Sequence, residues 1–167
     1  MQVATVPPRQ RPGALALVLH VLGANAVGLL GALTTATGDS SWYQSLAKPP
    51  FQPPPWVFGP VWTVLYTLMG IAAWRVTRSE APRPVIRTAI AAYAIQLVLN
   101  GIWTPVFFGA QAPRAGLVIL LLLVVAVAFT INAFRRADRT AAWLLVPYLL
   151  WGLFATVLNG SIVALGA

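Results

Sequence analysis

The hydrophobic positions of the chain fall into five long runs, at about residues 13–35, 55–77, 85–108, 113–134 and 140–165. Each run has about the 20 residues that an α-helix needs to cross the hydrocarbon core of a bilayer. Charged residues lie where the runs end, which is typical of membrane-spanning segments. The pattern therefore predicts an all-α integral membrane bundle of five transmembrane helices.

The connections between the runs predict how these helices are arranged. Three of them are only a few residues long, so consecutive helices are expected to be antiparallel neighbours. The connection at about residues 36–54 is the only long one. Because five spans and their connections use the whole length, residues 1–167 are expected to form a single membrane domain.

The basic residues near the ends of the runs predict the orientation, because Lys and Arg gather on the cytoplasmic side of spanning helices. The N-terminus is expected in the cytoplasm, and the C-terminus and the 36–54 loop outside; in a bacterium the membrane would be the inner membrane of the cell. Nine basic residues support this orientation and two oppose it: Arg9, Arg11, Arg75, Arg78, Arg83, Arg87, Arg135, Arg136 and Arg139 against Lys48 and Arg114.

The composition agrees with a membrane domain and excludes several kinds of chemistry. Hydrophobic residues make up 59% of the chain and charged residues 8%, which leaves too little polar surface for a water-soluble globule of this size. The net charge of +8 is assigned to membrane topology and not to nucleic acid, because the basic residues cluster where the apolar runs end.

No set of catalytic residues is evident. The chain has no Cys, and the three acids, Asp39, Glu80 and Asp138, all fall outside the spans. His20 is the only histidine and is expected to be packed and hydrogen-bonded, with axial haem ligation as the alternative. We therefore expect a protein that is not an enzyme, with no metal site and no cofactor.

Aromatic and amide side chains recur every three or four residues on three of the predicted helices, which places each set on one face. An unpaired amide is costly in hydrocarbon, so Gln96, Asn100 and Asn159 are expected to point into the bundle. The three sets are Phe58, Trp62, Tyr66 and Met69; Tyr93, Gln96, Asn100, Trp103 and Phe107; and Tyr148, Trp151, Ala155 and Asn159.

Two interpretations of these faces stay open at this stage: ordinary core packing, and a pocket for a flat apolar ligand. The first helix adds a face of small residues, Ala24, Gly28 and Gly31, which allows close approach. The fourth helix offers aliphatic bulk from Leu117 to Phe129 and is expected to be scaffold. Prolines at positions 60, 105 and 147 favour a pocket, because helix kinks open space.

The long connection ends in a stiff, proline-rich stretch, with five prolines in the seven positions from 49 to 55. One interpretation is a lid over the pocket, formed by Lys48, Pro49, Pro50 and Trp56. The other is that proline stops one helix and starts the next at Pro55, a favoured first-turn position. Trp42 and Tyr43, just before it, are also compatible with simple headgroup anchors.

The spacing of many of these residues resembles that of the translocator protein family, which includes the tryptophan-rich sensory proteins and the peripheral-type benzodiazepine receptor. The resemblance covers nearly the whole chain. It is carried by Trp42, Tyr43, Leu46, Lys48, Pro49, Pro50, Pro54, Trp56, Phe58, Trp62, Leu65 and Tyr66; by Gln96, Leu97, Asn100, Trp103, Pro105, Phe107, Phe108 and Gly109; and by Pro147, Tyr148, Trp151, Phe154, Ala155, Leu158 and Asn159.

The resemblance implies a five-helix bundle, often a homodimer in the bilayer, whose pocket opens under the first long loop and binds porphyrins, sterols or synthetic aromatic drugs. A sterol-recognition segment of eukaryotic relatives needs a Tyr and a basic residue after Leu158 and Asn159, and residues 160–167 contain neither, so a tetrapyrrole is favoured. The pocket positions that the resemblance implies are Tyr43, Trp62, Tyr66, Asn100, Trp103, Trp151 and Ala155.

The function that follows is that of a porphyrin-binding membrane protein, acting as a sensor or regulator of tetrapyrrole metabolism. Two alternatives remain: a translocator of porphyrins or sterols, and a light-dependent enzyme that degrades porphyrin.

Overall fold

The computed structural model describes residues 13–36 and 41–166, and this part of the chain is helical with no β-strand, as predicted. The helices are, in chain order, α1 (Ala14–Ala36), α2 (Ser41–Ser45), α3 (Pro55–Arg78), α4 (Arg83–Thr104), the π-helix η1 (Pro105–Gly109), α5 (Pro113–Ala137), α6 (Arg139–Leu144) and α7 (Val146–Ala164).

The predicted number of spans is confirmed for the described residues. They form five helical segments that are long and apolar enough to cross a membrane: Ala14–Leu33, Pro55–Arg78, Arg83–Gly109, Pro113–Ala137 and Arg139–Ala164. Their outward faces carry large apolar side chains such as Leu22, Leu121 and Leu150, each more than half exposed. In an integral membrane protein these side chains face lipid, so their exposure costs no hydrophobic free energy.

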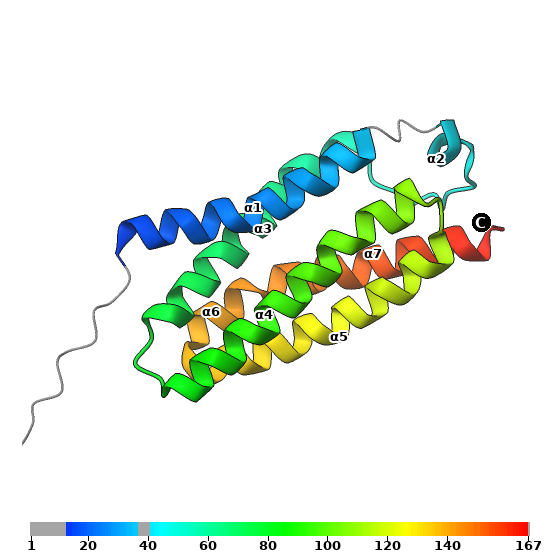
Figure 1. The fold of residues 1–167 in the computed structure, drawn as a ribbon. Helices are drawn as coiled ribbons and strands as arrows, with labels where there is room; N and C mark the ends of the chain where they lie inside the picture. Colours follow the sequence, from blue (N-terminus) through cyan, green and yellow to red (C-terminus); the bar gives the residue numbers. More distant parts are fainter. Residues whose placement is uncertain (1–12, 37–40, 167) are drawn as a thin grey trace, which may run out of the picture.

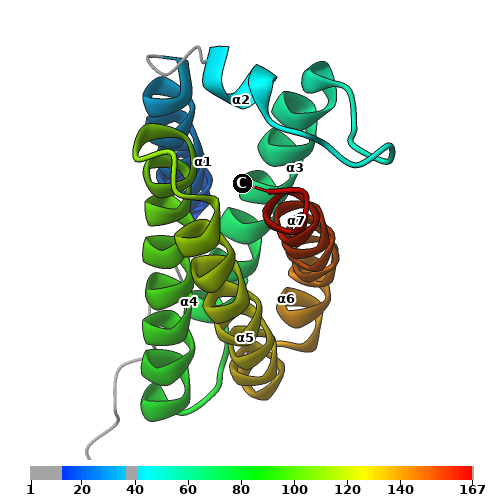
Figure 2. The same ribbon diagram turned by 90° about the vertical axis from the view of Figure 1, so that its right-hand side faces the viewer.

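The long helices run side by side along one direction (Figure 1), and the short helix α2 lies at the same end of the bundle as the end of α7. Helix α5 packs against α4 and α7, and α6 packs against both α3 and α5. Helix α1 packs against α3 and α4 at the edge of the bundle (Figure 2). Only 6% of the α1 span is buried, against 28–33% for the other four, so α1 is a peripheral helix.

Prolines set several helix boundaries. Each of α3, α4, α5 and α7 has a proline in its first two positions, where the missing N–H removes no intrahelical hydrogen bond. Helix α6 has a side-chain cap instead, because Asp138 Oδ1 accepts a hydrogen bond from the Ala141 amide at 2.8 Å. The Asp138 carboxylate also forms an ion pair with Arg75 at 2.9 Å, which ties α6 to α3.

Two of the predicted spans are less regular than the sequence indicated. The third span reaches residue 108 as expected, but α4 ends at Thr104 and the last turn from Pro105 is the π-helix η1. In the fifth span the helix is interrupted at Leu145, two residues before Pro147. Both changes follow from proline, which donates no hydrogen bond and crowds the carbonyl four residues earlier. Helix α3, in contrast, continues through Pro60.

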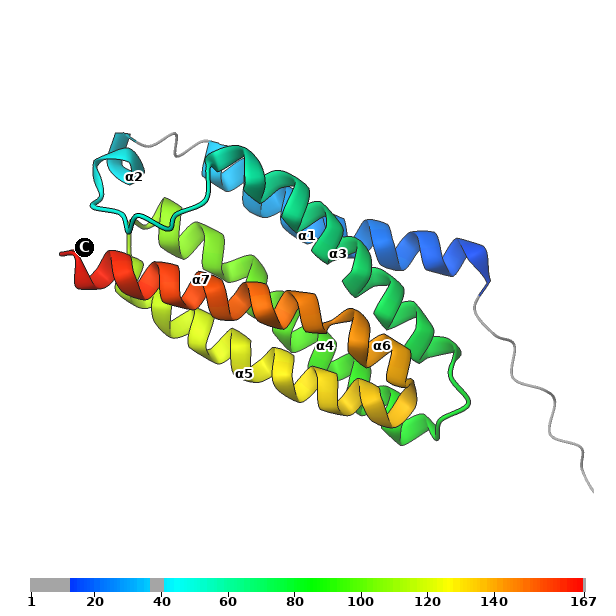
Figure 3. The same cartoon turned by 180° about the vertical axis from the view of Figure 1, so that it is seen from behind.

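The described basic residues of the predicted cytoplasmic set lie at the end of α3, the start of α4, the end of α5 and the start of α6. These parts of the helices share the end of the bundle away from α2 (Figure 3). Arg9 and Arg11 of the same set lie outside the described residues, as does Asp39. The charge asymmetry is therefore built into one end of the bundle, and which side of the membrane this end faces stays a prediction.

Candidate ligand-binding site

A hydrogen-bonded polar centre joins three helices in the interior. The hydroxyl of Tyr66 on α3 donates to Asn100 Oδ1 on α4, and Asn100 Nδ2 donates to the hydroxyl of Tyr148 on α7 at 2.9 Å. All three side chains are buried. In a lipid environment these bonds fix the relative positions of α3, α4 and α7, because the alternative is an unpaired polar group in hydrocarbon.

The prediction that the amides point inward is confirmed. Gln96, Asn100 and Asn159 are 1%, 6% and 2% exposed, respectively. Asn159 Nδ2 donates to the carbonyl of Pro113 at 3.0 Å, which ties α7 to the start of α5. Sequence reasoning did not single out Thr130, which is fully buried and donates to its own helix at the Ala126 carbonyl, 2.7 Å away.

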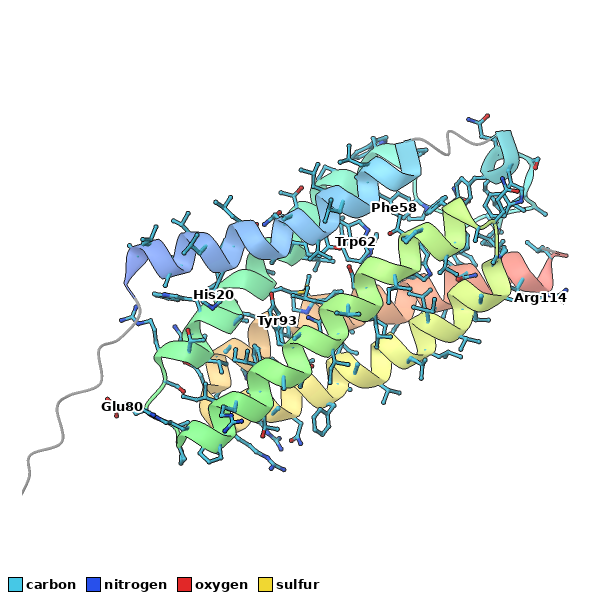
Figure 4. All side chains as sticks on the ribbon, in the orientation of Figure 1. His20, Phe58, Trp62, Glu80, Tyr93 and Arg114 are labelled. Atoms are coloured by element: carbon cyan, nitrogen blue, oxygen red, sulfur yellow. The ribbon has the colours of Figure 1, made fainter. Side chains whose placement is uncertain are left out.

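Aromatic rings extend this polar centre between α3 and α7. Trp62 stacks on Tyr66 with 5.3 Å between ring centroids, and it meets Tyr148 edge-on at 6.2 Å. Phe58, one turn before Trp62, meets Trp151 edge-on at 5.9 Å. These rings connect the first half of α3 to the first half of α7; Figure 4 labels Phe58 and Trp62 of α3. Trp62 and Trp151 are half-buried, so part of each ring stays accessible.

A second aromatic group lies at the α2 end of the bundle. Trp103 stacks on Phe107 with 5.2 Å between centroids, and Tyr43 from α2 meets Phe107 and Phe108 edge-on at 6.1 and 5.2 Å. The indole Nε1 of Trp103 is buried and has no hydrogen-bond partner among the described residues. Burial raises the pKa of Tyr43 above its ordinary value, so its hydroxyl remains protonated at neutral pH.

The predicted site residues thus fall into two neighbouring groups. Trp62, Tyr66 and Asn100 are linked by ring contacts and hydrogen bonds, and Trp151 meets Phe58, which lies one turn before Trp62 on α3. Tyr43 and Trp103 are linked through Phe107. The two groups are adjacent because Asn100 and Trp103 are one turn apart on α4. Ala155 is half-buried one turn after Trp151 and also packs against the core.

The predicted lid residues differ in their surroundings. Lys48 Nζ donates to the carbonyl of Gln44 at 3.0 Å and lies 4.8 Å from the centre of the Tyr43 ring. Pro49 is buried and Pro50 is exposed. Trp56 lies in the first turn of α3, where its side chain is 75% exposed. This loop also contributes a contact to the aromatic groups, between Phe51 and Phe154 of α7, with centroids 6.4 Å apart.

His20 has the hydrogen-bonded environment expected of it: Nδ1 lies 2.6 Å from the carbonyl of Ala16 in its own helix. The residues that the structure describes contain no group of three or more His, Cys, Asp and Glu side chains placed to hold a metal ion.

Comparison with known proteins identifies the family of this bundle. The TspO/MBR family matches residues 20–165 of the chain. The chain belongs to the TspO/MBR family. It is 42% identical over 140 residues to the tryptophan-rich protein TspO of Chlorobaculum tepidum, covering 84% of this chain and 89% of that protein. It is 42% identical over 121 residues to the translocator protein of Homo sapiens, covering 71% of this chain and 70% of that protein.

A relative from an archaeon matches an even larger part of this TspO/MBR chain. The tryptophan-rich protein TspO of Archaeoglobus fulgidus is 42% identical over 156 residues, which is 92% of this chain and 98% of that protein. The resemblance found in the sequence is therefore confirmed at the level of the family.

The structure of this TspO/MBR protein places further residues at the site, which the prediction from the sequence did not include. Tyr148 completes the polar centre, and Phe58 and Phe154 flank Trp151. Tyr148 and Phe58 lie on the aromatic faces found in the sequence, and Phe154 is among the residues that carry the resemblance. Their contacts depend on the distance between α3 and α7, which periodicity does not give.

Proposed function

We propose that this membrane protein binds porphyrin-like tetrapyrroles, or other flat apolar ligands, against the aromatic groups around Asn100 and so acts as a sensor or regulator of tetrapyrrole metabolism. The observation that carries the proposal is the set of half-buried tryptophans, Trp62, Trp103 and Trp151, arranged around a rigid hydrogen-bonded centre. A tetrapyrrole offers the large flat π surface that such rings recognise.

The polar groups supply orientation for such a ligand. Each well-placed stacking contact contributes about 0.5–1.5 kcal/mol beyond burial of apolar area. The indole N–H of Trp103, which has no partner in the described part of the chain, is a hydrogen-bond donor, and donating to a ligand would satisfy it. The loop residues Phe51 and Tyr43 contact α7 and η1, which supports the lid interpretation of the loop.

A binding role is favoured over catalysis. The relatives carry the names of sensory and translocator proteins, and the described carboxylates Glu80 and Asp138 lie at the far end of the bundle from Trp103 (Figure 4). Among the residues that the structure describes, no carboxylate is therefore available at the aromatic site to act as an acid or base. The homodimer that the resemblance implies stays a prediction; Ala91 and Ala94 on the outward face of α4 are exposed and would let a second copy approach closely.

The test is a titration of the detergent-purified protein with protoporphyrin, followed by quenching of tryptophan fluorescence. Wild type is expected to show saturable quenching, and Trp62→Ala and Trp151→Ala are expected to weaken affinity by about three- to tenfold. Trp143→Ala is the matched control, because Trp143 is 69% exposed on α6 and its loss also removes one fluorophore. Binding that is absent, or equally weakened in all three variants, would contradict the proposal.

Transport is the second candidate, because several relatives are named translocator proteins. The test is porphyrin flux into proteoliposomes. Flux in wild type that is lost in Trp62→Ala would favour a translocator, whereas saturable binding without flux would favour a sensor. Conversion of bound porphyrin to a new product under illumination, lost in Trp151→Phe, would instead favour the enzyme.

A further inference from the structure

A groove on the lipid-facing surface lies at the end of the bundle opposite the aromatic groups. It has a volume of about 200 Å³ and runs between the start of α4 and the end of α5. Val85 and Thr88 line one wall, and Phe129, Asn132, Ala133 and Arg136 line the other. It is separate from every residue of the proposed tetrapyrrole site.

The groove changes character along its length. Phe129, Asn132, Ala133 and Arg136 follow one another at intervals of three, one and three residues, so they share one face of α5. Phe129 lies seven residues before Arg136, or about 10 Å deeper along the helix axis. Phe129 is 57% exposed to the surroundings of the bundle. The groove is therefore cationic and polar at the membrane surface and apolar in the hydrocarbon region.

The polar end of the groove is positively charged. Arg136 is exposed and has no ion-pair or hydrogen-bond partner among the described residues, and none of the described residues that line the groove is acidic. Arg135 donates to Asn132 Oδ1 at 3.2 Å, which places a second guanidinium beside the groove. Arg83 and Arg87 adjoin the lining residues of α4 in sequence. An anionic group with hydrogen-bond acceptors complements this arrangement.

A neighbouring hollow at the same end makes a useful contrast. It is lined by Trp74, Arg75, Arg78, Ser79 and Asp138. Here Arg75 is already ion-paired with Asp138, and Arg78 lies over the Trp74 ring, 4.4 Å from its centre. Its carboxylate repels an anion, and its cations have partners. Of these two hollows, only the α4–α5 groove combines a cation that has no partner among the described residues with an apolar extension into the bilayer.

We propose that the groove between α4 and α5 binds an anionic phospholipid, whose headgroup phosphate pairs with Arg136 and whose acyl chain lies along Phe129. A basic pocket between spanning helices next to one leaflet is the arrangement that recognises anionic headgroups. The order of charge and apolar surface in the groove matches the order of phosphate and acyl chain in a phospholipid. A free phosphate ion would leave the apolar part of the groove unused.

The experiment is native mass spectrometry of the full-length, detergent-solubilised protein titrated with dioleoylphosphatidylglycerol or dioleoylphosphatidylcholine. Wild type is expected to retain one phosphatidylglycerol in preference to phosphatidylcholine. Arg136→Gln is expected to weaken phosphatidylglycerol retention by about five-fold or more, the effect of one basic residue at the membrane surface. Arg139→Gln is the matched control, because it removes the same charge at the same end outside the groove.

A second variant tests the space inside the groove independently of the charge of Arg136. Thr88 is exposed and lines the groove, so Thr88→Phe fills it without changing the charge and is expected to reduce phosphatidylglycerol retention as well. Equal losses in Arg136→Gln and Arg139→Gln, no preference for phosphatidylglycerol, or its full displacement by inorganic phosphate would each overturn the proposal. Circular dichroism and unchanged protoporphyrin binding confirm that the variants are folded.

Discussion

At the scale of single residues, a few contacts between polar, aromatic and small residues position the helices in the interior of this TspO/MBR protein. Asn100 is one of them, since its amide bonds to Tyr66 and Tyr148 on two other helices. Gly28 on α1 has a related role, because a Cβ at this position would overlap the Tyr66 ring. The position of Tyr66, and of the Trp62 ring that stacks on it, therefore depends on small and polar neighbours.

The Asn100 centre gives a prediction about stability. Asn100→Leu removes both hydrogen bonds and leaves two buried hydroxyls unpaired, so we expect the free energy of unfolding to fall by about 1–2 kcal/mol. Tyr148→Phe removes only one bond and is expected to cost less. Denaturant titration in detergent followed by circular dichroism measures both. Equal stability of Asn100→Leu and wild type would show that the centre contributes nothing to the fold.

At the scale of elements, α1 differs from the other spanning helices because little of it is buried. Its position against α3 depends on a close approach of the two backbones at Gly70, where an added Cβ would lie 2.5 Å from Val21 Cα and 2.7 Å from the His20 carbonyl. Small residues at helix interfaces allow such an approach, and van der Waals packing then holds the helices together.

Gly70→Ala is therefore expected to loosen α1. The atoms that would clash are backbone atoms and cannot rotate away, so the helices must separate, at a cost of about 1–3 kcal/mol. Hydrogen exchange of the α1 amides should become faster than in wild type. Gly59→Ala, in the same helix with nothing within 4 Å of the new Cβ, should leave exchange in α1 unchanged. Unchanged exchange in Gly70→Ala would show that α1 is held by other contacts.

At the scale of the whole molecule, the bundle has two different ends. One end carries the turns between α3 and α4 and between α5 and α6 with their arginines, and the other carries α2, η1 and the aromatic groups. The proposed tetrapyrrole site and the proposed lipid groove lie towards opposite ends. The orientation in the membrane therefore decides which leaflet or compartment each site meets.

This orientation can be tested with single cysteines, since the natural chain has none. Ala110 and Thr140 are exposed at opposite ends of the bundle. A membrane-impermeant maleimide is expected to label Ala110→Cys in intact cells and Thr140→Cys only after permeabilisation, because the arginine-rich end is expected in the cytoplasm. The reverse labelling would show that the chain inserts the other way round.

The sequence by itself determined the class and the inward faces. Apolar runs of spanning length and charges at their ends predicted five helices, since an unpaired backbone or amide group is costly in lipid. Asn100, Gln96 and Asn159 are buried for the same reason. These properties depend on local composition and period, which can be read along the chain. The motifs of the translocator protein family also predicted the family.

The tertiary structure decided what the faces contact. The bond from Asn100 to Tyr148 depends on how helices distant in sequence pack against one another. The lipid groove needs the start of α4 beside the end of α5, and its parts are about 40 residues apart in the chain. Helical period gives the direction of a side chain, but only packing gives its partner.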